Sequence, residues 1–410
     1  MANPYREIFS APGTKAFSFA GLIARMPISM LGIGIVTMFS QLQGNYWLAG
    51  AIAATFALAS ALIAPQISRM ADQWGQSRVL LPATAVSVLS VSILLLCARY
   101  EAPTWTLFLA TLCAGVMPNM SAMVRARWAE LYRGSHKLHT AFSFESVVDE
   151  ICFIIGPVLS VSSSVILFPE AGPLLSCVFL TIGVLLFTLQ KNTEPKVHPH
   201  TTTHNGTVIK IGSLRLLALT LAAIGTIFGT IDVVSIAFAE GQGNTVAASV
   251  VLSVYAVGSC LAGLVYGTLT IKTPLHRQFF WAVTISMITM LSLFFVDSIT
   301  KLIIAVFFAG MSVAPTMIIT MGLVEKIVPK SQVTEGMTWA ITGLGIGVSI
   351  GSAIAGWVID GYGAQNGFLI AIAAGALAFI IVILGYKSLK LAYQSESKNI
   401  EVVQPQAEIK

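Results

Sequence analysis

The chain has 410 residues, of which 56% are hydrophobic and only 10% are charged, and its net charge is +5. Soluble domains typically carry about 25% charged residues, so this chain has too few charges to cover a water-facing surface of its size. The composition therefore excludes an ordinary soluble globular protein and predicts an integral membrane protein.

Apolar runs of about 20 residues recur along the chain, and each is long enough as a helix to cross a hydrocarbon layer of about 30 Å. The first begins at Ala16 and contains Arg25, which is unlike a cleaved signal peptide with a short apolar centre, so we expect it to be retained. The expected spans are 16–39, 46–67, 79–98, 104–124, 140–163, 172–190, 214–237, 245–269, 278–296, 301–324, 336–359 and 366–387. They predict an all-α integral membrane protein with twelve transmembrane helices.

One wide polar stretch, residues 191–213, divides the expected spans into six and six. Its threonines, histidines and lysines are typical of a linker. The predicted organisation is an amino-terminal six-helix bundle at 1–190, a cytoplasmic linker at 191–213, a carboxy-terminal six-helix bundle at 214–388 and a cytoplasmic tail at 389–410.

The two halves repeat weakly. A shift of 195 residues aligns Gly115 with Gly310 and Gly156 with Gly351. Parallel repeats of six spans occur in transporters whose two halves rock against each other. A few such matches can arise by chance, so the repeat supports the division into halves without establishing it.

Lys and Arg residues are distributed unequally between the two sets of loops. An even number of spans places both termini on one side, and that side holds all of the 23 Lys and Arg residues except Arg25, Arg99 and Lys301. Positively charged loops stay in the cytoplasm during insertion, so we expect cytoplasmic termini and a bacterial type of inner (plasma) membrane. This asymmetry accounts for the net charge without a nucleic-acid partner.

Cysteines and histidines show no metal-binding pattern. The five cysteines fall within apolar runs without CxxC spacing, and the six histidines fall in expected loops. We therefore expect no metal, no cofactor and no disulfide framework.

The loop after the second expected span reads Ser-Arg-Met-Ala-Asp-Gln-Trp-Gly-Gln-Ser-Arg, residues 68–78. It resembles the signature of this loop in the major facilitator superfamily (MFS), with Asp72, Gly75 and Arg78 carrying the match. The resemblance implies an MFS fold and a gating loop in which the aspartate and a basic partner form a latch that opens when the halves move. Ser68 replaces the first glycine of the signature and Gln73 its arginine.

Span five contains Gly156 and Pro157, which resemble the antiporter motif of the drug and proton exchangers within this superfamily. The proline removes a backbone donor and bends the helix, while the glycine lets a neighbouring helix come close. Cys152 stands where that motif has its first glycine, and Thr111 stands where drug exporters have an arginine in span four. The resemblance to drug exporters is therefore partial.

Charged residues inside the expected spans need a reason, because each costs at least about 2.5 to 3.5 kcal/mol at the centre of a helix. Counting about 1.5 Å per residue, Arg25 in span one and Asp149 in span five both reach the middle of the bilayer. Glu145 lies one turn before Asp149 on the same helix face. We predict that Arg25 faces Asp149, with Glu145 below and either Arg125 or Arg127 within reach.

This charged cluster has two interpretations. It exchanges a proton and couples transport to the proton gradient, or it is a fixed ion-pair network that holds spans one, four and five together. Glu150 is adjacent to Asp149 and cannot share its face, so at least one of the two serves packing or points to another span.

Asp232 in span seven is a second candidate for a proton or a cationic group of the substrate, or else a residue wetted at the membrane surface. Tyr255 and Trp339 are aromatic candidates for the substrate cavity, with lipid contact or packing as the alternative. Gly343, Gly347 and Gly351 in span eleven lie at four-residue spacing. This pattern serves either helix packing or sliding between the halves.

These features predict a monomeric secondary transporter that exports a small organic molecule in exchange for protons by alternating access. An importer that uses the same charges in symport is the first alternative. A membrane-embedded enzyme and a transporter-derived sensor are further alternatives. No HExxH or GxxxxGK[ST] pattern occurs in the sequence, which disfavours intramembrane metal hydrolysis and direct ATP use.

Overall fold

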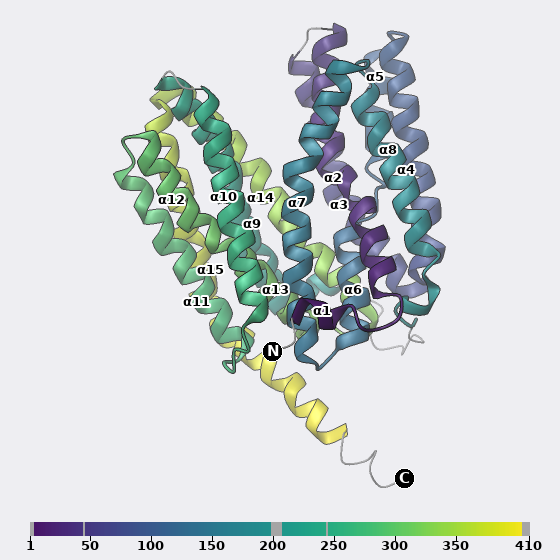
Figure 1. Ribbon diagram of the computed structural model, residues 1–410, viewed down its shortest axis with the longest axis vertical. Helices are drawn as coiled ribbons and strands as arrows, with labels where there is room; N and C mark the ends of the chain where they lie inside the picture. Colours follow the sequence, from purple (N-terminus) through teal and green to yellow (C-terminus); the bar gives the residue numbers. More distant parts are fainter. Residues whose placement is uncertain (1–3, 44–45, 198–206, 243–244, 404–410) are drawn as a thin grey trace. The chain divides into compact units, whose positions relative to one another are not determined.

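The computed structural model of the chain describes residues 4–43, 46–197, 207–242 and 245–403 (Figure 1). Every regular element in these ranges is helical. The chain divides into two compact units, which we call the amino-terminal unit (Met1–Ala141 and Val148–Pro199) and the carboxy-terminal unit (Phe142–Val147 and His200–Lys410). Each unit is described by itself.

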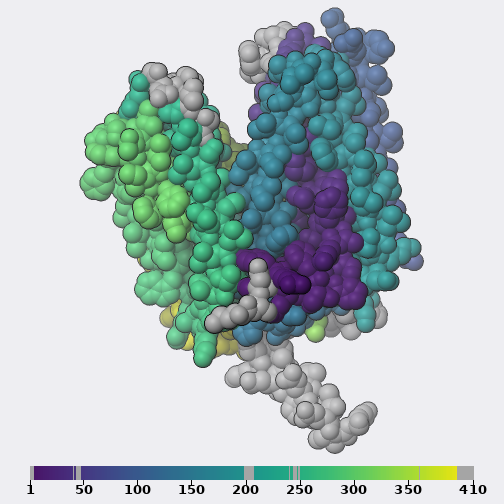
Figure 2. All heavy atoms as spheres, viewed as in Figure 1, coloured from purple at the N-terminus to yellow at the C-terminus, as the bar shows by residue number. Residues whose placement is uncertain are grey.

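The amino-terminal unit contains the first eight α-helices, except for Phe142–Val147 of α7, which belong to the carboxy-terminal unit. They are α1 (Pro4–Ile8), α2 (Thr14–Gln43), α3 (Tyr46–Trp74), α4 (Gln76–Arg99), α5 (Thr104–Ala114), α6 (Met120–Tyr132), α7 (His136–Ile166) and α8 (Ala171–Thr188), followed by the short 3-10 helix η1 (Lys191–Thr193). Helix α2 packs most extensively against α8. Figure 2 shows atoms of α2, in purple, against those of α7, in blue-teal, on one face of this unit.

The carboxy-terminal unit contains the remaining helices. They are η2 (Val208–Lys210), α9 (Gly212–Gly241), α10 (Thr245–Thr268), α11 (Leu275–Leu291), η3 (Ser292–Phe295), α12 (Ile299–Met311), α13 (Val313–Ile327), η4 (Lys330–Gln332), α14 (Val333–Tyr362) and α15 (Ala364–Val403). Helix α9 is central, because it packs against both α14 and α15. The buried core of this unit includes Ile231 and Phe238 of α9 and Phe368 of α15.

Ten helical segments within the described residues are long and apolar enough to cross a membrane. Two further expected spans correspond to α7 and to the pair α5 and α6. Helix α7 has 31 residues, but Glu145, Asp149 and Glu150 lower the apolar character of its middle. The all-helical membrane fold with twelve spans that the sequence predicts is therefore confirmed.

Spans four and ten are not continuous helices, in contrast to the expectation. Helix α5 ends before Gly115, and α6 begins after Asn119, whose side chain accepts a hydrogen bond from the Ala122 backbone N–H at 3.0 Å. Pro118 accounts for the break, since it lacks an N–H and disfavours helical geometry in the residue before it. Span ten breaks at Ser312, between α12 and α13, three residues before Pro315.

The weak repeat has a structural counterpart at these breaks. A Cβ atom on Gly115 would touch Ala59 and Ser60 of α3, and a Cβ atom on Gly310 would touch Tyr255 and Ser259 of α10. Each glycine thus allows the broken span to lie against the second span of its own unit.

The glycines of span eleven pack within the carboxy-terminal unit. Cβ atoms on Gly343, Gly347 and Gly351 would meet the backbone of α9 at Ala218, Ala222 and Thr226, in that order. The packing interpretation of this stripe is therefore correct, and sliding between the halves is not needed to explain it.

Two expectations about polar segments need correction. Helix α15 continues to Val403, beyond the expected end of the last span at residue 387. Within this continuation Leu389 is fully buried, and the Tyr393 ring lies 5.2 Å from that of His276. His136 and His139 belong to α7, and His276 belongs to α11, so these three histidines do not lie in loops.

Candidate functional site

Three helices of the amino-terminal unit bring charged side chains together. Arg25 lies on α2, Asp149 on α7, and Ser121 and Arg125 on α6. The cap at Asn119 fixes where α6 begins. Ser121 and Arg125 are four residues apart on that helix, so they share one face.

Asp149 is the centre of this cluster. Its Oδ1 atom lies 2.8 Å from Nη1 of Arg25, and its Oδ2 atom lies 2.7 Å from Nη2 of Arg125. The Ser121 hydroxyl lies 2.9 Å from Oδ1 and 2.8 Å from Oδ2 of the same carboxylate. Nη1 of Arg125 in turn donates to the Ser121 hydroxyl, and Nε of Arg25 donates to the Gly21 carbonyl at 3.2 Å. We call these four side chains the Asp149 cluster.

The Asp149 cluster is shielded from solvent. The side chain of Arg25 is 2% exposed, that of Arg125 is 0% exposed and that of Asp149 is 22% exposed. Two guanidinium groups face one carboxylate, so the ionised cluster has one excess positive charge. Charges inside a membrane span are tolerated when they pair with one another, and the predicted contact between Arg25 and Asp149 is present.

The contact between α2 and α7 extends beyond the charges. The Ser29 hydroxyl of α2 donates to the Cys152 carbonyl of α7 at 2.8 Å, and the Ser160 hydroxyl of α7 donates to the Met30 carbonyl of α2 at 2.9 Å. Gly156 lies between them, and a Cβ atom there would collide with the Ser29 side chain. The close helix contact expected at Gly156 therefore forms against α2. Pro157 lies inside the continuous helix α7.

The sequence predicts that either Arg125 or Arg127 lies within reach of Arg25 and Asp149, and the structure distinguishes between them. Arg125 binds Asp149, whereas Arg127 points to another cluster of the same unit. Nε of Arg127 donates to Oε1 of Gln76 at 2.9 Å, and its Nη1 donates to the Gln190 carbonyl and the Thr193 hydroxyl, both at 2.9 Å. The guanidinium also lies 3.7 Å from the centroid of the Phe187 ring.

The predicted gating loop joins this second cluster. Gly75 has φ +92°, a left-handed conformation that favours glycine, and it turns the chain from α3 into α4. Glu194 contacts the chain two residues after this glycine. Its carboxylate accepts hydrogen bonds from the Ser77 backbone N–H at 2.8 Å and from the Ser77 hydroxyl at 2.5 Å. Burial lowers the pKa of Arg127 to about 10, and the charge of Glu194 opposes that shift. Asp72 is half-buried and Arg78 is exposed.

The remaining candidates lie apart from the Asp149 cluster or next to it on α7. Glu145 is fully buried one turn before Asp149, and Glu150 is half-buried. Asp232 on α9 is exposed, and no side chain in the described ranges forms a hydrogen bond or an ion pair with it.

Both aromatic candidates for a substrate cavity have neighbours in the carboxy-terminal unit. Tyr255 is 5% exposed, and its ring meets that of Phe228 edge-on at 5.3 Å, so its position favours the packing alternative. Trp339 donates its indole N–H to Glu335 at 3.4 Å.

Sequence reasoning missed Ser121, Gln76 and Glu194. For Ser121 the available signal was its spacing of four residues from Arg125 together with the proline break before it. For Glu194 no local pattern was available, because its partner Ser77 is 117 residues away in the chain.

Comparisons with known proteins agree with this architecture. A family model described as "Major Facilitator Superfamily" matches residues 17–248 and 216–404. No curated protein matches the chain at a significant level.

Three solved structures resemble this one. A bacterial homologue of the iron transporter ferroportin, in its outward-facing state, is 13% identical with a TM-score of 0.75. The match covers 92% of this chain and 100% of the ferroportin homologue. The human organic anion transporter MFSD10 (TETRAN) is 14% identical with a TM-score of 0.69, covering 93% and 100%. The transporter FucP in its outward conformation is 14% identical with a TM-score of 0.65, and the match covers 90% of this chain and 99% of FucP. A second structure, of the E. coli fucose:proton symporter FucP, is 14% identical with a TM-score of 0.63.

The match to the family model over most of the chain indicates a secondary transporter rather than an enzyme. The chain belongs to the Major Facilitator Superfamily, whose members carry small molecules across membranes.

Proposed function

We propose that this protein is a proton-coupled exporter of a small organic molecule that works by alternating access as a monomer in the inner membrane. The observation that supports this most is the Asp149 cluster. Protonating Asp149, or drawing it toward a charged cargo, would remove the carboxylate that pairs with the buried guanidinium groups of Arg25 and Arg125. Such a state is costly in a membrane, so a change of charge at the cluster favours a different arrangement of α2, α6 and α7.

Asp232 is the proposed partner of this cluster in coupling. It is a carboxylate within a candidate membrane span (Gly212–Ala239), and it lacks a polar partner among the described side chains. An aspartate in that situation faces water or carries a proton. In this proposal Asp232 takes up and releases the proton, and the Asp149 cluster responds to the cargo.

Two features of the sequence support the proposed direction of transport and the proposed orientation of the chain in the membrane. The resemblance of Gly156 and Pro157 to the antiporter motif supports export rather than import. The concentration of Lys and Arg residues on one side supports cytoplasmic termini.

Transport in inside-out membrane vesicles tests the proposal. Vesicles from a host without its own efflux systems are screened with cationic, zwitterionic and neutral amphiphiles while the interior is acidified. Export predicts that one class accumulates inside and that dissipating the proton gradient abolishes the accumulation. A symporter working toward the cytoplasm predicts no accumulation in these vesicles.

Two variants and one control identify the coupling groups. We expect Asp149→Asn and Asp232→Asn each to abolish gradient-driven accumulation. The control is Asp297→Asn, which removes an exposed carboxylate paired with Lys301 at 2.6 Å outside the spans and should transport normally. Wild-type accumulation with an unchanged pH profile in both test variants would refute the coupling role.

A further inference from the structure

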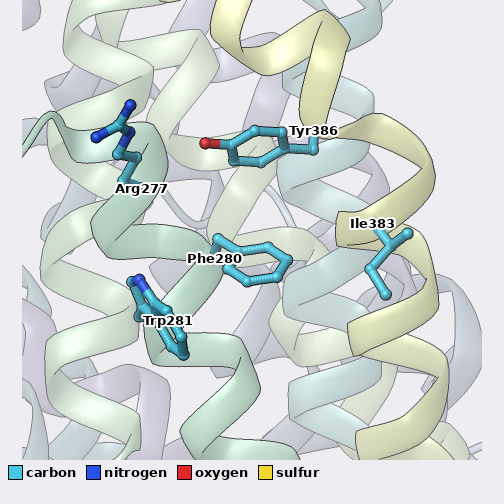
Figure 3. A pocket seen from close by; sticks show the side chains of 5 residues that line it. All are labelled: Arg277, Phe280, Trp281, Ile383 and Tyr386. Atoms are coloured by element: carbon cyan, nitrogen blue, oxygen red, sulfur yellow. The ribbon is translucent and has the colours of Figure 1, made fainter.

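The carboxy-terminal unit has a cavity that the proposed transport mechanism does not use. It has a volume of about 560 Å³ and is lined by Arg277, Phe280 and Trp281 of α11 and by Ile383 and Tyr386 of α15 (Figure 3). Helices α11 and α15 pack against each other. Trp281 is 61% exposed and Ile383 is 48% exposed, so the cavity is open to the surroundings of the protein. We call it the α11–α15 groove.

Polar and apolar groups are separated along this groove. Figure 3 shows the Tyr386 hydroxyl pointing to the side of the groove on which Arg277 lies, while Phe280, Trp281 and Ile383 lie further along it. Trp281 follows Arg277 by four residues on α11, and Ile383 precedes Tyr386 by three residues on α15. Each helix therefore places its polar group one turn away from its apolar group.

The order of polar and apolar groups along the groove matches the change from the polar surface to the apolar interior of the membrane. The candidate membrane span on α11 is Leu275–Phe295, so Arg277 lies in its first turn and Trp281 lies about 6 Å deeper. The span on α15 runs to Gln394, and the ring contact between His276 and Tyr393 shows that the two ends meet. Tyr386 is thus nearer the polar end than Ile383. The groove is polar at the membrane surface and apolar inside.

The charge of the groove is positive. Arg277 forms no ion pair or hydrogen bond with any side chain that the structure describes, and no carboxylate lines the cavity. Lys390 follows Tyr386 by four residues on the same face of α15, and Lys387 and Lys272 lie near the same two helix ends in the sequence. Basic sites between membrane helices bind the headgroups of anionic lipids.

The floor of the groove is built from aromatic rings. Phe280 lies 5.6 Å from Tyr386 at an interplanar angle of 69° and 5.7 Å from Trp281 at 80°. These contacts hold Tyr386 and Trp281 in place on the two walls. A cavity of this size falls within the range of about 300–1,000 Å³ that is typical of small-molecule sites.

We propose that the α11–α15 groove binds an anionic phospholipid of the surrounding bilayer. Arg277 and the Tyr386 hydroxyl bind the headgroup phosphate, and the upper part of an acyl chain lies along Phe280, Trp281 and Ile383. An anionic headgroup matches the excess of basic residues, while the apolar half of the groove has no role for a free anion. The lipid binds whether or not the transport proposal is correct, because the groove contains none of the residues assigned to coupling.

Quenching of tryptophan fluorescence by brominated lipids tests this site in the full-length protein. The protein is placed in nanodiscs with phosphatidylglycerol or phosphatidylcholine brominated near the headgroup. The chain has seven tryptophans, so the signal of Trp281 is the difference between the wild type and the Trp281→Phe variant. We expect this signal to be quenched at a lower mole fraction of phosphatidylglycerol than of phosphatidylcholine.

Variants at Arg277 and a charge-matched control make the test specific. Arg277→Gln should weaken the preference for phosphatidylglycerol by about fivefold, the effect of one basic residue near an anionic surface, and Arg277→Lys should retain most of it. Lys301→Gln removes an exposed charge elsewhere in the unit and should leave the preference unchanged. Because Arg277 is exposed, the variant should fold, which circular dichroism checks.

Three outcomes would overturn the proposal. Equal quenching by the two lipids would show that the groove does not select an anionic headgroup. Displacement of the lipid by millimolar inorganic phosphate would identify a site for free anions. Absence of any Trp281-dependent quenching would show that another protein, or a second copy of this chain, covers the groove.

Discussion

Arg25 and Asp149 are 124 residues apart in the chain, yet Nη1 of Arg25 lies 2.8 Å from Oδ1 of Asp149. Arg125 binds the other oxygen of the same carboxylate at 2.7 Å. One carboxylate thus pairs with guanidinium groups from two different helices. The stability of the amino-terminal unit should therefore depend on Asp149 more than on either arginine alone.

Replacing Asp149 with Asn should destabilise the protein by about 3–5 kcal/mol, because it removes the carboxylate that pairs with two buried guanidinium groups. The thermal unfolding of the detergent-solubilised protein measures this change. Adding Arg25→Gln to Asp149→Asn should restore part of the loss, since it removes one of the two buried cations that Asp149 paired with. The exposed ion pair between Asp297 and Lys301 provides a control. Asp297→Asn should leave the unfolding temperature unchanged. Equal effects of the two aspartate variants would contradict the prediction.

Replacing Ser121 with Ala should weaken the cluster without removing a charge. The Ser121 hydroxyl contacts both oxygens of Asp149 and accepts from Arg125, and its loss should cost about 1–3 kcal/mol, as for hydrogen bonds to charged groups. The matched control is Ser92→Ala, whose hydroxyl donates to the Val88 carbonyl of its own helix at 2.8 Å. Chemical unfolding should place Ser121→Ala clearly below Ser92→Ala in stability.

Replacing Gly347 with Ala should separate α14 from α9. A Cβ atom there would collide with the Ala222 backbone of α9, whereas a Cβ atom on Gly345, two residues earlier, would meet nothing within 4 Å. We expect Gly347→Ala to destabilise the carboxy-terminal unit by about 1–3 kcal/mol. Gly345→Ala should be neutral or stabilising by up to about 1 kcal/mol. Similar unfolding temperatures for the two variants would show that α9 and α14 are not in close contact.

Replacing Glu194 with Gln should detach the segment after α8 from the gating loop, because the two hydrogen bonds from Ser77 lose their charged acceptor. Limited proteolysis should then cleave this segment faster than in the wild type. The exposed loop residue Glu101 provides the control, since Glu101→Gln should be cleaved at the wild-type rate.

The effect of Glu194→Gln should not vary between pH 6 and 9. Burial lowers the pKa of Arg127 to about 10, and the charge of Glu194 opposes this shift. Arg127 therefore keeps its proton throughout that range. Above pH 10 the folded state loses this proton before the unfolded state does, so the contribution of Arg127 to stability should rise as the pH rises above 10. A marked change in the cleavage ratio between pH 6 and 9 would contradict this assignment.

The sequence alone determined the class of protein and the span pattern. Hydrophobic runs and scarce charges leave no folded state in water, and this depends on composition and length rather than on helix orientation. The pairing of Arg25 with Asp149 was also predictable, because depth in the membrane follows from counting residues along a helix, and a buried charge needs a partner at the same depth.

Only the tertiary structure decided which other side chains complete the cluster. The break at Pro118 and the cap at Asn119 set the rotation of α6, and that rotation directs Arg125 to Asp149 and Arg127 to Gln76. Two arginines two residues apart point in different directions on a helix, so counting along the chain could not choose between them. In the same way, α9 determined the role of the glycines of α14, because small residues permit close packing without specifying the partner helix.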